Sequence, residues 1–240
     1  MEHDELIDHL RREGEVLGEV PLSDVDVPTC PGWTLPDLVA HVARVHRWQE
    51  AQVRAPSPDE LQQVDRADPP PLDQLDDWYH TGLTSLVAAL ESTDPDHLTP
   101  TWFGPRPARF WARRAAHETA IHRWDAQAAV DSPSDLDPDQ AIDALDELLE
   151  VLAPRRFSND DWSGPEASIH LHATDVAGEW LIRMGPGGID VTHVHEKGDV
   201  AARGSASNLM LMMAGRVPPA RLELFGDGAM IDRWHRMVRL

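Results

Sequence analysis

Glu118, His122 and Asp125 are the residues whose types and spacing best suit a chemical site. They lie in a run of helix-forming residues, 111–125, that contains neither Gly nor Pro. At about 100° per residue, the three side chains fall within roughly 60° of one another on one helix face. A carboxylate and an imidazole that face a neighbouring helix together can form half of a metal site. A simple i,i+4 pair between Glu118 and His122 is an equally good interpretation of this helix taken alone.

The zinc-protease helix pattern is excluded for this stretch. That pattern needs two histidines four residues apart with a glutamate after the first. Here His117 and His122 are five residues apart, which places them about 140° apart around a helix. We therefore expect His117 to be structural or to support a ligand rather than to bind a metal itself.

A third ligand would have to come from another helix, and His41 is the candidate. The apolar periodicity predicts a helix over 35–54. Thr34 is expected to cap its N-terminus, because Pro36 lies in the first turn and Asp37 follows three residues after Thr34, a pattern close to a capping box. His41 lies in the middle of its apolar face. A lone histidine in that position is more often a satisfied core residue, so both interpretations stay open at this point.

The rest of the first domain is also predicted to be helical. Apolar residues at helical spacing predict helices over 2–18, 35–54, 72–91, 109–130 and 138–153. The intervening segments 55–70 and 92–108 are rich in turn-forming residues, and long loops at the end of a bundle often shape a pocket. We place this helical domain at residues 1–155, followed by a linker over 155–165.

Beyond the linker the hydrophobic period changes from helical to alternating, which indicates a small α+β domain at 166–240. Its predicted strands are 168–173, 179–184, 190–195, 200–203 and 221–225. Its predicted helices are 205–214 and a final helix that ends at Arg239.

Four histidines of this domain have a suggestive spacing. His170 and His172 share one face of a predicted strand, as do His193 and His195 on another, and pairing of these strands could bring all four together. No carboxylate or cysteine is spaced with them as a further ligand. A solvated or interdomain sheet face is therefore the favoured interpretation.

Composition excludes several partners. The formal net charge is −21, from 42 acidic and 21 basic residues, which opposes binding to nucleic-acid backbones and to anionic membrane surfaces. An anionic substrate would need a local arginine pocket. The single cysteine, Cys30, cannot form an internal disulfide, and no apolar leader or membrane-spanning run is visible. We expect a soluble cytoplasmic protein.

Several motifs together resemble the mycothiol-dependent maleylpyruvate isomerase family. They are the Cys30–Trp33 turn, His41 on the next helix and the block His117–Asp125. The C-terminal segments Ile169–Asp175, Gly178–Trp180 and Gly204–Ser207 look like the companion domain of that family, which is similar to sterol-carrier folds. The resemblance covers nearly the whole chain and implies a two-domain protein with an N-terminal DinB-like, metal-binding four-helix bundle and a C-terminal small α+β domain.

The resemblance implies a zinc site made by His41, Glu118 and His122, the same ligands considered above, and a low-molecular-weight thiol such as mycothiol as cofactor. Three protein ligands leave a position open, as catalytic zinc requires, and a bound thiol would be held as thiolate. Addition to an electrophilic double bond would then support isomerisation or S-transfer. The alternative is a non-catalytic metal-containing protein whose C-terminal domain holds a small apolar ligand.

Three further residues complete the set of predictions. Asp125 is expected to support the site from behind the ligands, by orienting His122 or by pairing with Arg123 or Arg114. Arg216, which follows an apolar helix and precedes Val217-Pro218-Pro219, either caps that helix or holds a substrate anion as a catalytic residue. Cys30 is expected to pack rather than to act as a nucleophile.

Overall fold

The computed structural model describes residues 1–64, 68–157, 162 and 165–238. The chain divides into two compact units, Met1–Ser134 and Asp135–Leu240. The units correspond to the expected helical domain and the expected α+β domain, and each is described by itself below.

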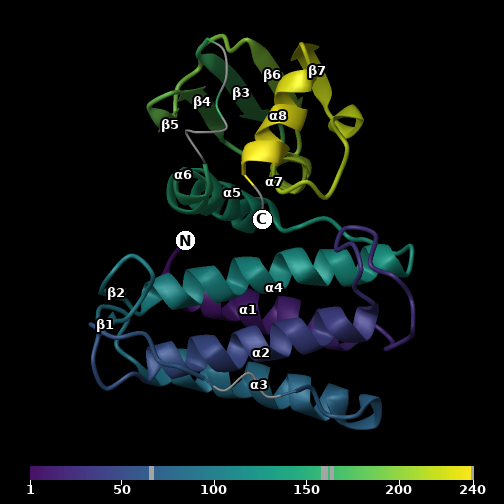
Figure 1. Cartoon of the computed structure of the whole chain (residues 1–240), viewed down its shortest axis with the longest axis vertical. Helices are drawn as coiled ribbons and strands as arrows, with labels where there is room; N and C mark the ends of the chain where they lie inside the picture. The colour runs from purple at the N-terminus through teal and green to yellow at the C-terminus, as the bar shows by residue number, and fades with distance from the viewer. Residues whose placement is uncertain (65–67, 158–161, 163–164, 239–240) are drawn as a thin grey trace. The chain divides into compact units, whose positions relative to one another are not determined.

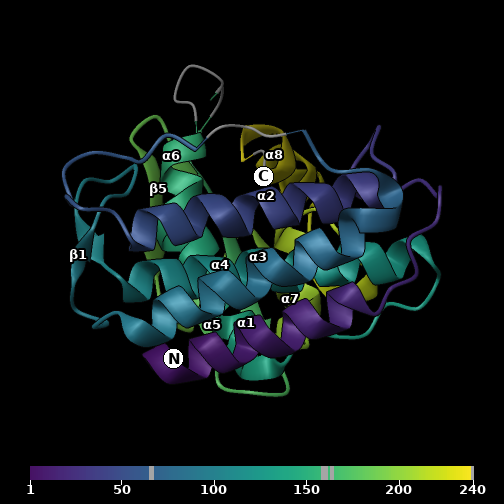
Figure 2. The same ribbon diagram turned by 90° about the horizontal axis from the view of Figure 1, so that it is seen from below.

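The first unit is a four-helix bundle, as the sequence predicted. α1 packs mainly on α4 and α2 on α3, and contacts of α1 with α3 and of α2 with α4 close the bundle. The four helices run alongside one another in both views (Figures 1 and 2). Their bounds are α1 (His3–Gly18), α2 (Leu35–Val53), α3 (Leu72–Ser92) and α4 (Arg109–Ala129).

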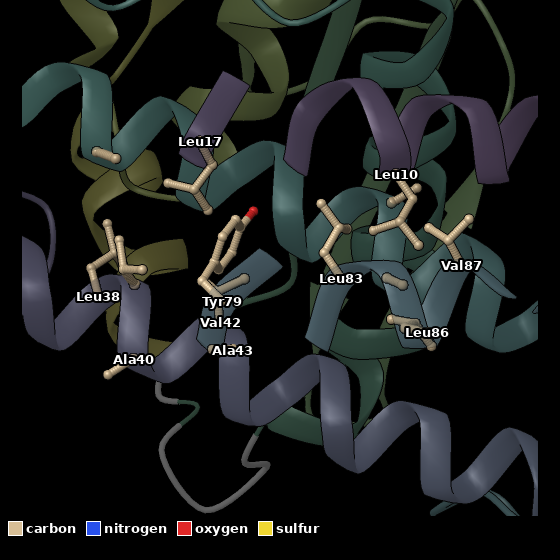
Figure 3. Close-up of a cluster of buried hydrophobic side chains, with 14 of the residues drawn as sticks. Leu10, Leu17, Leu38, Ala40, Val42, Ala43, Tyr79, Leu83, Leu86 and Val87 are labelled. Atoms are coloured by element: carbon tan, nitrogen blue, oxygen red, sulfur yellow. The ribbon is translucent and has the colours of Figure 1, made fainter. Parts of the chain in front are cut away.

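Tyr79 is an example of how the bundle core satisfies its polar groups. Its ring is fully buried among aliphatic side chains of α1, α2 and α3 (Figure 3). Burial is the main cause that raises the pKa of Tyr79. The hydroxyl donates to the carbonyl oxygen of Gly14 at 2.8 Å. Gly14 also allows α1 to approach α3 closely, because a Cβ there would lie 2.5 Å from Leu83 Cδ2.

The loop between α3 and α4 is more ordered than the sequence predicted. Two short strands, β1 (Leu98–Thr99) and β2 (Arg106–Pro107), pair in antiparallel fashion. The segment between them carries Trp102 and Phe103. Trp102 stacks on Trp48 of α2 with ring centroids 5.0 Å apart, so the loop is fixed to the bundle by aromatic contacts.

The second unit begins earlier than expected, with the fifth predicted helix. That helix is α5 (Pro138–Glu147), which continues through a π-helical segment, Leu148–Leu152, into α6 (Ala153–Arg156). α5 packs against α7 (Ala206–Met213) of the same unit. The division at 134/135 thus differs from the boundary expected at residue 155, because the apolar face of α5 is buried by the second unit. Part of the linker predicted over 155–165 lies outside the described residues.

The second unit contains a five-stranded sheet of order β5-β4-β3-β6-β7 (Figure 1). Only the β3–β6 pair is parallel; the other three pairs are antiparallel. The strands and the last helix are β3 (Ala167–Ala173), β4 (Glu179–Gly185), β5 (Gly188–Thr192), β6 (Val200–Gly204), β7 (Glu223–Gly226) and α8 (Ala229–Met237).

Two predicted strands differ in extent from the observed ones. The strand expected over 190–195 ends at Thr192, and the strand expected over 221–225 follows a 3-10 turn, Pro219–Arg221, and begins at Glu223. The predicted end of the last helix, Arg239, lies outside the described residues. Among the helices described, none combines the length and the apolar character needed to cross a bilayer.

Candidate metal centre

Two helices of the bundle bring the three predicted ligands together. His41 projects from α2, and Glu118 and His122 project from α4. Glu118 Oε1 lies 3.6 Å from His41 Nε2 and 3.3 Å from His122 Nε2. One ligand atom of each residue lies within 4.8 Å of those of the other two. Two imidazoles and a carboxylate in this arrangement have the donor chemistry of a catalytic zinc site.

Glu118 is held so that one oxygen faces the histidines. Its other oxygen, Oε2, pairs with the guanidinium of Arg114, one turn earlier on α4. Burial raises the pKa of Glu118, but Arg114 and the hydrogen bonds from His122 and His41 outweigh it, so the pKa lies well below its ordinary value. The carboxylate is therefore ionised, as a metal ligand must be. The sequence pattern had indicated Arg114 only as a partner of Asp125.

Asp125 orients His122. Its Oδ2 lies 3.0 Å from His122 Nδ1, and the carboxylate is fully buried. With Nδ1–H donated to Asp125, Nε2 of His122 faces Glu118 and His41 and becomes a metal ligand once it loses its proton. Burial lowers the pKa of His122, but hydrogen bonds to Asp125, Cys30 and Glu118 outweigh it and raise that pKa well above its ordinary value. Of the expected partners, Arg123 instead pairs with the buried Glu13.

The turn before α2 holds Asp125 from the other side. Thr29 Oγ1 donates to Asp125 Oδ1 at 2.6 Å, and Cys30 Sγ lies 3.7 Å from Oδ2. Gly32 in this turn has φ of 84°, a conformation that favours glycine. Trp33 then packs on the His41 ring, with centroids 4.8 Å apart. The Cys30–Trp33 motif thus contacts both Asp125 and His41 and helps to hold the candidate ligands in place. Thr29 was not predicted from the sequence to have a role at this site.

A pocket of about 760 Å³ opens beside His41. One face of α2 lines it with residues three, four and seven positions after His41, namely Arg44, Val45 and Trp48. Val45 and Trp48 are only partly buried. The two long loops supply the other walls, as anticipated: Leu61–Val64 and Asp68 from one, and Trp102 from the other.

Two arginines of the pocket differ in what they already bind. Arg47 donates to the carbonyl oxygens of Ala43 and Trp78, at 2.9 and 2.6 Å, and lies over the Trp78 ring. Arg44 makes no hydrogen bond or ion pair with any of the described residues. It lies one turn from His41 on the same face of α2, a position suited to an anionic group in the pocket.

The other histidines considered in the bundle lie outside the ligand group. His46 is fully buried and its Nε2 lies 2.9 Å from Thr119 Oγ1. Burial lowers the pKa of His46 to about 3, so this ring is neutral. His117 is likewise buried. For His117 the sequence predicted a structural or supporting role.

Arg216 belongs to the second unit and is half-buried. Its Nη1 donates to the carbonyl oxygen of Ala214 at 2.8 Å, at the end of α7. This contact agrees with the interpretation that Arg216 caps its own helix. Binding of a substrate anion by Arg216 stays a prediction.

The histidines of the second unit form a group of three rather than four. The rings of His170, His172 and His195 lie with centroids 5.5 to 6.4 Å apart. His193 instead lies 2.9 Å from Glu150. The expectation that no carboxylate accompanies this set was wrong, because Glu179 contacts both His172 and His195. β4 lies between β3 and β5 in the sheet, so the partner comes from a strand that spacing did not connect with them.

Known proteins show the same two-part organisation. Residues 3–127 match the model of the mycothiol maleylpyruvate isomerase N-terminal domain, and residues 139–233 match the model of the corresponding C-terminal domain. An uncharacterized protein found in two strains of Mycobacterium tuberculosis is 25% identical over 164 residues, which cover 63% of this chain and 81% of that protein.

Solved structures agree in fold. A crystal structure of the mycothiol-dependent maleylpyruvate isomerase superposes with a TM-score of 0.59 at 17% identity, covering 90% of each chain. A histidine-to-alanine mutant of that isomerase superposes with a TM-score of 0.57 at 16% identity, covering 93% of each chain. With both of its units matched by the models of one enzyme family, the chain belongs to the mycothiol-dependent maleylpyruvate isomerase family.

Proposed function

We propose that this chain is a zinc-dependent enzyme that uses a mycothiol-type thiol in one of two ways: to isomerise a small electrophilic substrate, or to attach the thiol to that substrate through sulfur (S-transfer). The observation that carries the proposal is the convergence of His41, Glu118 and His122 on one point beside a pocket. Family membership supports the thiol, and the donor set supports the metal. The maleylpyruvate isomerase reaction is the first activity to test.

The residues present fit a zinc ion. Glu118 is ionised, and His122 has its Nδ1 held by a carboxylate, the arrangement that commonly fixes the tautomer of a zinc-bound histidine. When bound, a zinc ion would supply a Lewis acid that lowers the pKa of a thiol, and the thiol would supply a nucleophile whose reversible addition to a conjugated double bond permits cis–trans isomerisation.

The remaining roles fall to side chains of this chain. Asp125 holds the proton on Nδ1 of His122, and Arg114 holds the distal oxygen of Glu118. Trp48 and Trp102 form a stacked aromatic wall of the pocket. Arg44 is placed to bind a carboxylate of the substrate, a role for which Arg216 is the second candidate.

The metal part of the proposal is tested by elemental analysis of the full-length chain. We expect about one zinc ion to be lost in His122→Ala relative to the wild type, because one of three protein ligands is removed. The matched control is His80→Ala, which removes a histidine that likewise has a carboxylate one turn away, Asp76 at 3.4 Å, but no third ligand within the part of the chain that the structure describes. Equal zinc in His122→Ala and the wild type would contradict the assignment.

The catalytic part is tested with maleylpyruvate and mycothiol. We expect turnover that requires both the thiol and the metal, whereas a non-catalytic binding protein would show neither dependence. Arg44→Gln should raise KM for the anionic substrate at unchanged zinc content, and Arg54→Gln, at the C-cap of the same helix but outside the pocket lining, serves as control. Arg216→Ala is compared in parallel: an intact kcat/KM with slightly lower stability indicates helix capping alone.

A further inference from the structure

Outside the bundle, the second unit contains another group of side chains with the chemistry of metal ligands. His170, Glu179 and His195 each offer an atom within 4.8 Å of the other two. His170 comes from β3, Glu179 from β4, and His195 from the segment that follows β5. We propose that these three residues form a second divalent transition-metal site, separate from that of the bundle.

The sheet fixes two of the ligands. β3 and β4 pair in antiparallel register, with His172 directly opposite Glu179. His170 is two residues from His172, so both histidines project from the same face of β3. Glu179 Oε1 accepts hydrogen bonds from His172 Nδ1 at 2.5 Å and from His195 Nδ1 at 2.7 Å. The carboxylate thus stands between imidazoles from two different segments.

A glycine allows the third ligand to approach. The segment after β5 returns over β3 before β6 begins at Val200. At Gly198 a Cβ would lie 2.8 Å from the backbone nitrogen of His170 and 3.2 Å from its Cβ. Any other residue at this position would push the segment away from β3, and His195, three residues earlier, would move with it. The close approach at Gly198 therefore helps to assemble the group.

A buried nitrogen of His170 is an independent indication that this group binds an ion. Its side chain is only 8% exposed, and its Nε2 is buried without a hydrogen-bond partner among the described residues. Buried polar atoms are normally satisfied, and an unsatisfied one calls for an explanation such as an ion. The histidine–glutamate hydrogen bonds alone leave this nitrogen unpaired. A cation held between His170, Glu179 and His195 accounts for all three side chains.

The donor set indicates which ions suit the site. Imidazole nitrogens favour Zn²⁺, Ni²⁺ and Cu²⁺ over Mg²⁺ and Ca²⁺, which prefer an all-oxygen environment. His172, hydrogen-bonded to Glu179, is placed to orient the carboxylate from outside the ligand set. The side chain of His195 is 78% exposed, so the ion would be open to solvent and exchangeable, unlike an ion in a closed structural site.

The test measures zinc stoichiometry by calorimetric titration of metal-free, untagged, full-length chain. We expect about two ions per wild-type chain and about one in His170→Ala/His195→Ala. The doubly substituted bundle variant Glu118→Gln/His122→Ala should keep the second ion, so failure of the bundle site and failure of this site are seen separately. His195→Ala is measured alone as well, because the His195 side chain is mostly exposed and its removal should not disturb folding. Circular dichroism checks that each variant has the wild-type secondary structure.

His193→Ala is the matched control, because His193 is two residues away, is 51% exposed and faces a different pair of carboxylates, Asp146 and Glu150, in a group that contains a single histidine. It should bind as many ions as the wild type. Two outcomes overturn the proposal: an unchanged stoichiometry in both the His170→Ala/His195→Ala and His195→Ala variants, or loss of the second ion in His193→Ala. The proposal is supported if the second ion is retained in His193→Ala and lost in both His195→Ala and His170→Ala/His195→Ala.

Discussion

At the scale of single residues, Asp125 determines how the bundle site is oriented. Its Oδ1 accepts from Thr29 and its Oδ2 faces His122 Nδ1 and Cys30. The carboxylate thus joins the turn before α2 to the ligand face of α4. Burial lowers the pKa of His122, and the hydrogen bonds to Asp125, Cys30 and Glu118 outweigh this effect and raise that pKa.

Asp125→Asn should weaken the site without emptying it. An amide is a poorer acceptor for Nδ1–H than a carboxylate, and loss of such outer partners typically costs about 10- to 100-fold in metal affinity or activity. Competition with a chelator of known affinity measures the change. Asp131→Asn is the control, because Asp131 follows α4 with φ of 56°, a conformation that asparagine also tolerates. Wild-type zinc affinity in Asp125→Asn would contradict the role assigned here.

His46 should make stability depend on pH. Burial lowers its pKa to about 3 in the folded chain, whereas an unfolded histidine titrates near 6.5. Between these values the unfolded state binds one more proton, so stability is fully present above about pH 6.5 and falls as pH decreases, by about 1.4 kcal/mol per pH unit from this group.

Urea unfolding of the metal-free chain at several pH values checks this expectation. The slope of unfolding free energy against pH should be smaller in His46→Gln than in the wild type between pH 6 and about pH 4, because glutamine does not titrate. Identical slopes in His46→Gln and the wild type would show that His46 is not held neutral by the fold.

At the scale of elements, α2 begins where its sequence predicts. Thr34 Oγ1 accepts from the Asp37 backbone N–H, and Asp37 Oδ2 accepts from the Thr34 N–H at 2.9 Å, a complete capping box. The hydrogen bonds from Thr34 lower the pKa of Asp37. Because this cap sets the first turn of the helix that carries His41, its effect reaches the candidate ligands.

Thr34→Ala should lower the free energy of unfolding by about 1 kcal/mol, the usual cost of losing an N-cap side chain. The loss should be similar for Asp37→Asn, which keeps the shape but weakens the acceptor. Asp73→Asn is the control, since Asp73 lies in the first turn of α3, where no side-chain cap bond is formed. Thermal unfolding compares the variants, and equal melting temperatures for all four proteins would exclude a capping role.

Local patterns explain which parts of the structure could be predicted. The four bundle helices follow from apolar residues at helical spacing, and Glu118 and His122 lie on one face because both belong to the same helix. Arg44, Thr29 and the group around Glu179 were missed for a common reason. Each acquires its role through tertiary packing, such as the approach of a loop to α2 or the pairing of β3 with β4, which spacing along the chain does not encode.

At the scale of the whole molecule, the position of α5 is the main difference from the expected organisation. Its amphipathic pattern predicted a helix correctly but did not reveal which unit buries its apolar face. The structure shows that α5 packs against α7, and the family model for the C-terminal domain begins at residue 139, within the first turn of α5. α5 is therefore a structural part of the C-terminal unit.

Separate expression of fragments tests this organisation. Residues 135–240 should unfold cooperatively in urea, because α5 covers the apolar side of α7, whose residues Leu209–Met213 are buried. Residues 156–240 lack that cover, so large apolar side chains become exposed and we expect a poorly folded, aggregating fragment. Residues 1–134, which contain His41, Glu118 and His122, should fold as a helical bundle and bind zinc. Cooperative unfolding of 156–240 with the same midpoint as 135–240 would instead support a boundary near residue 155.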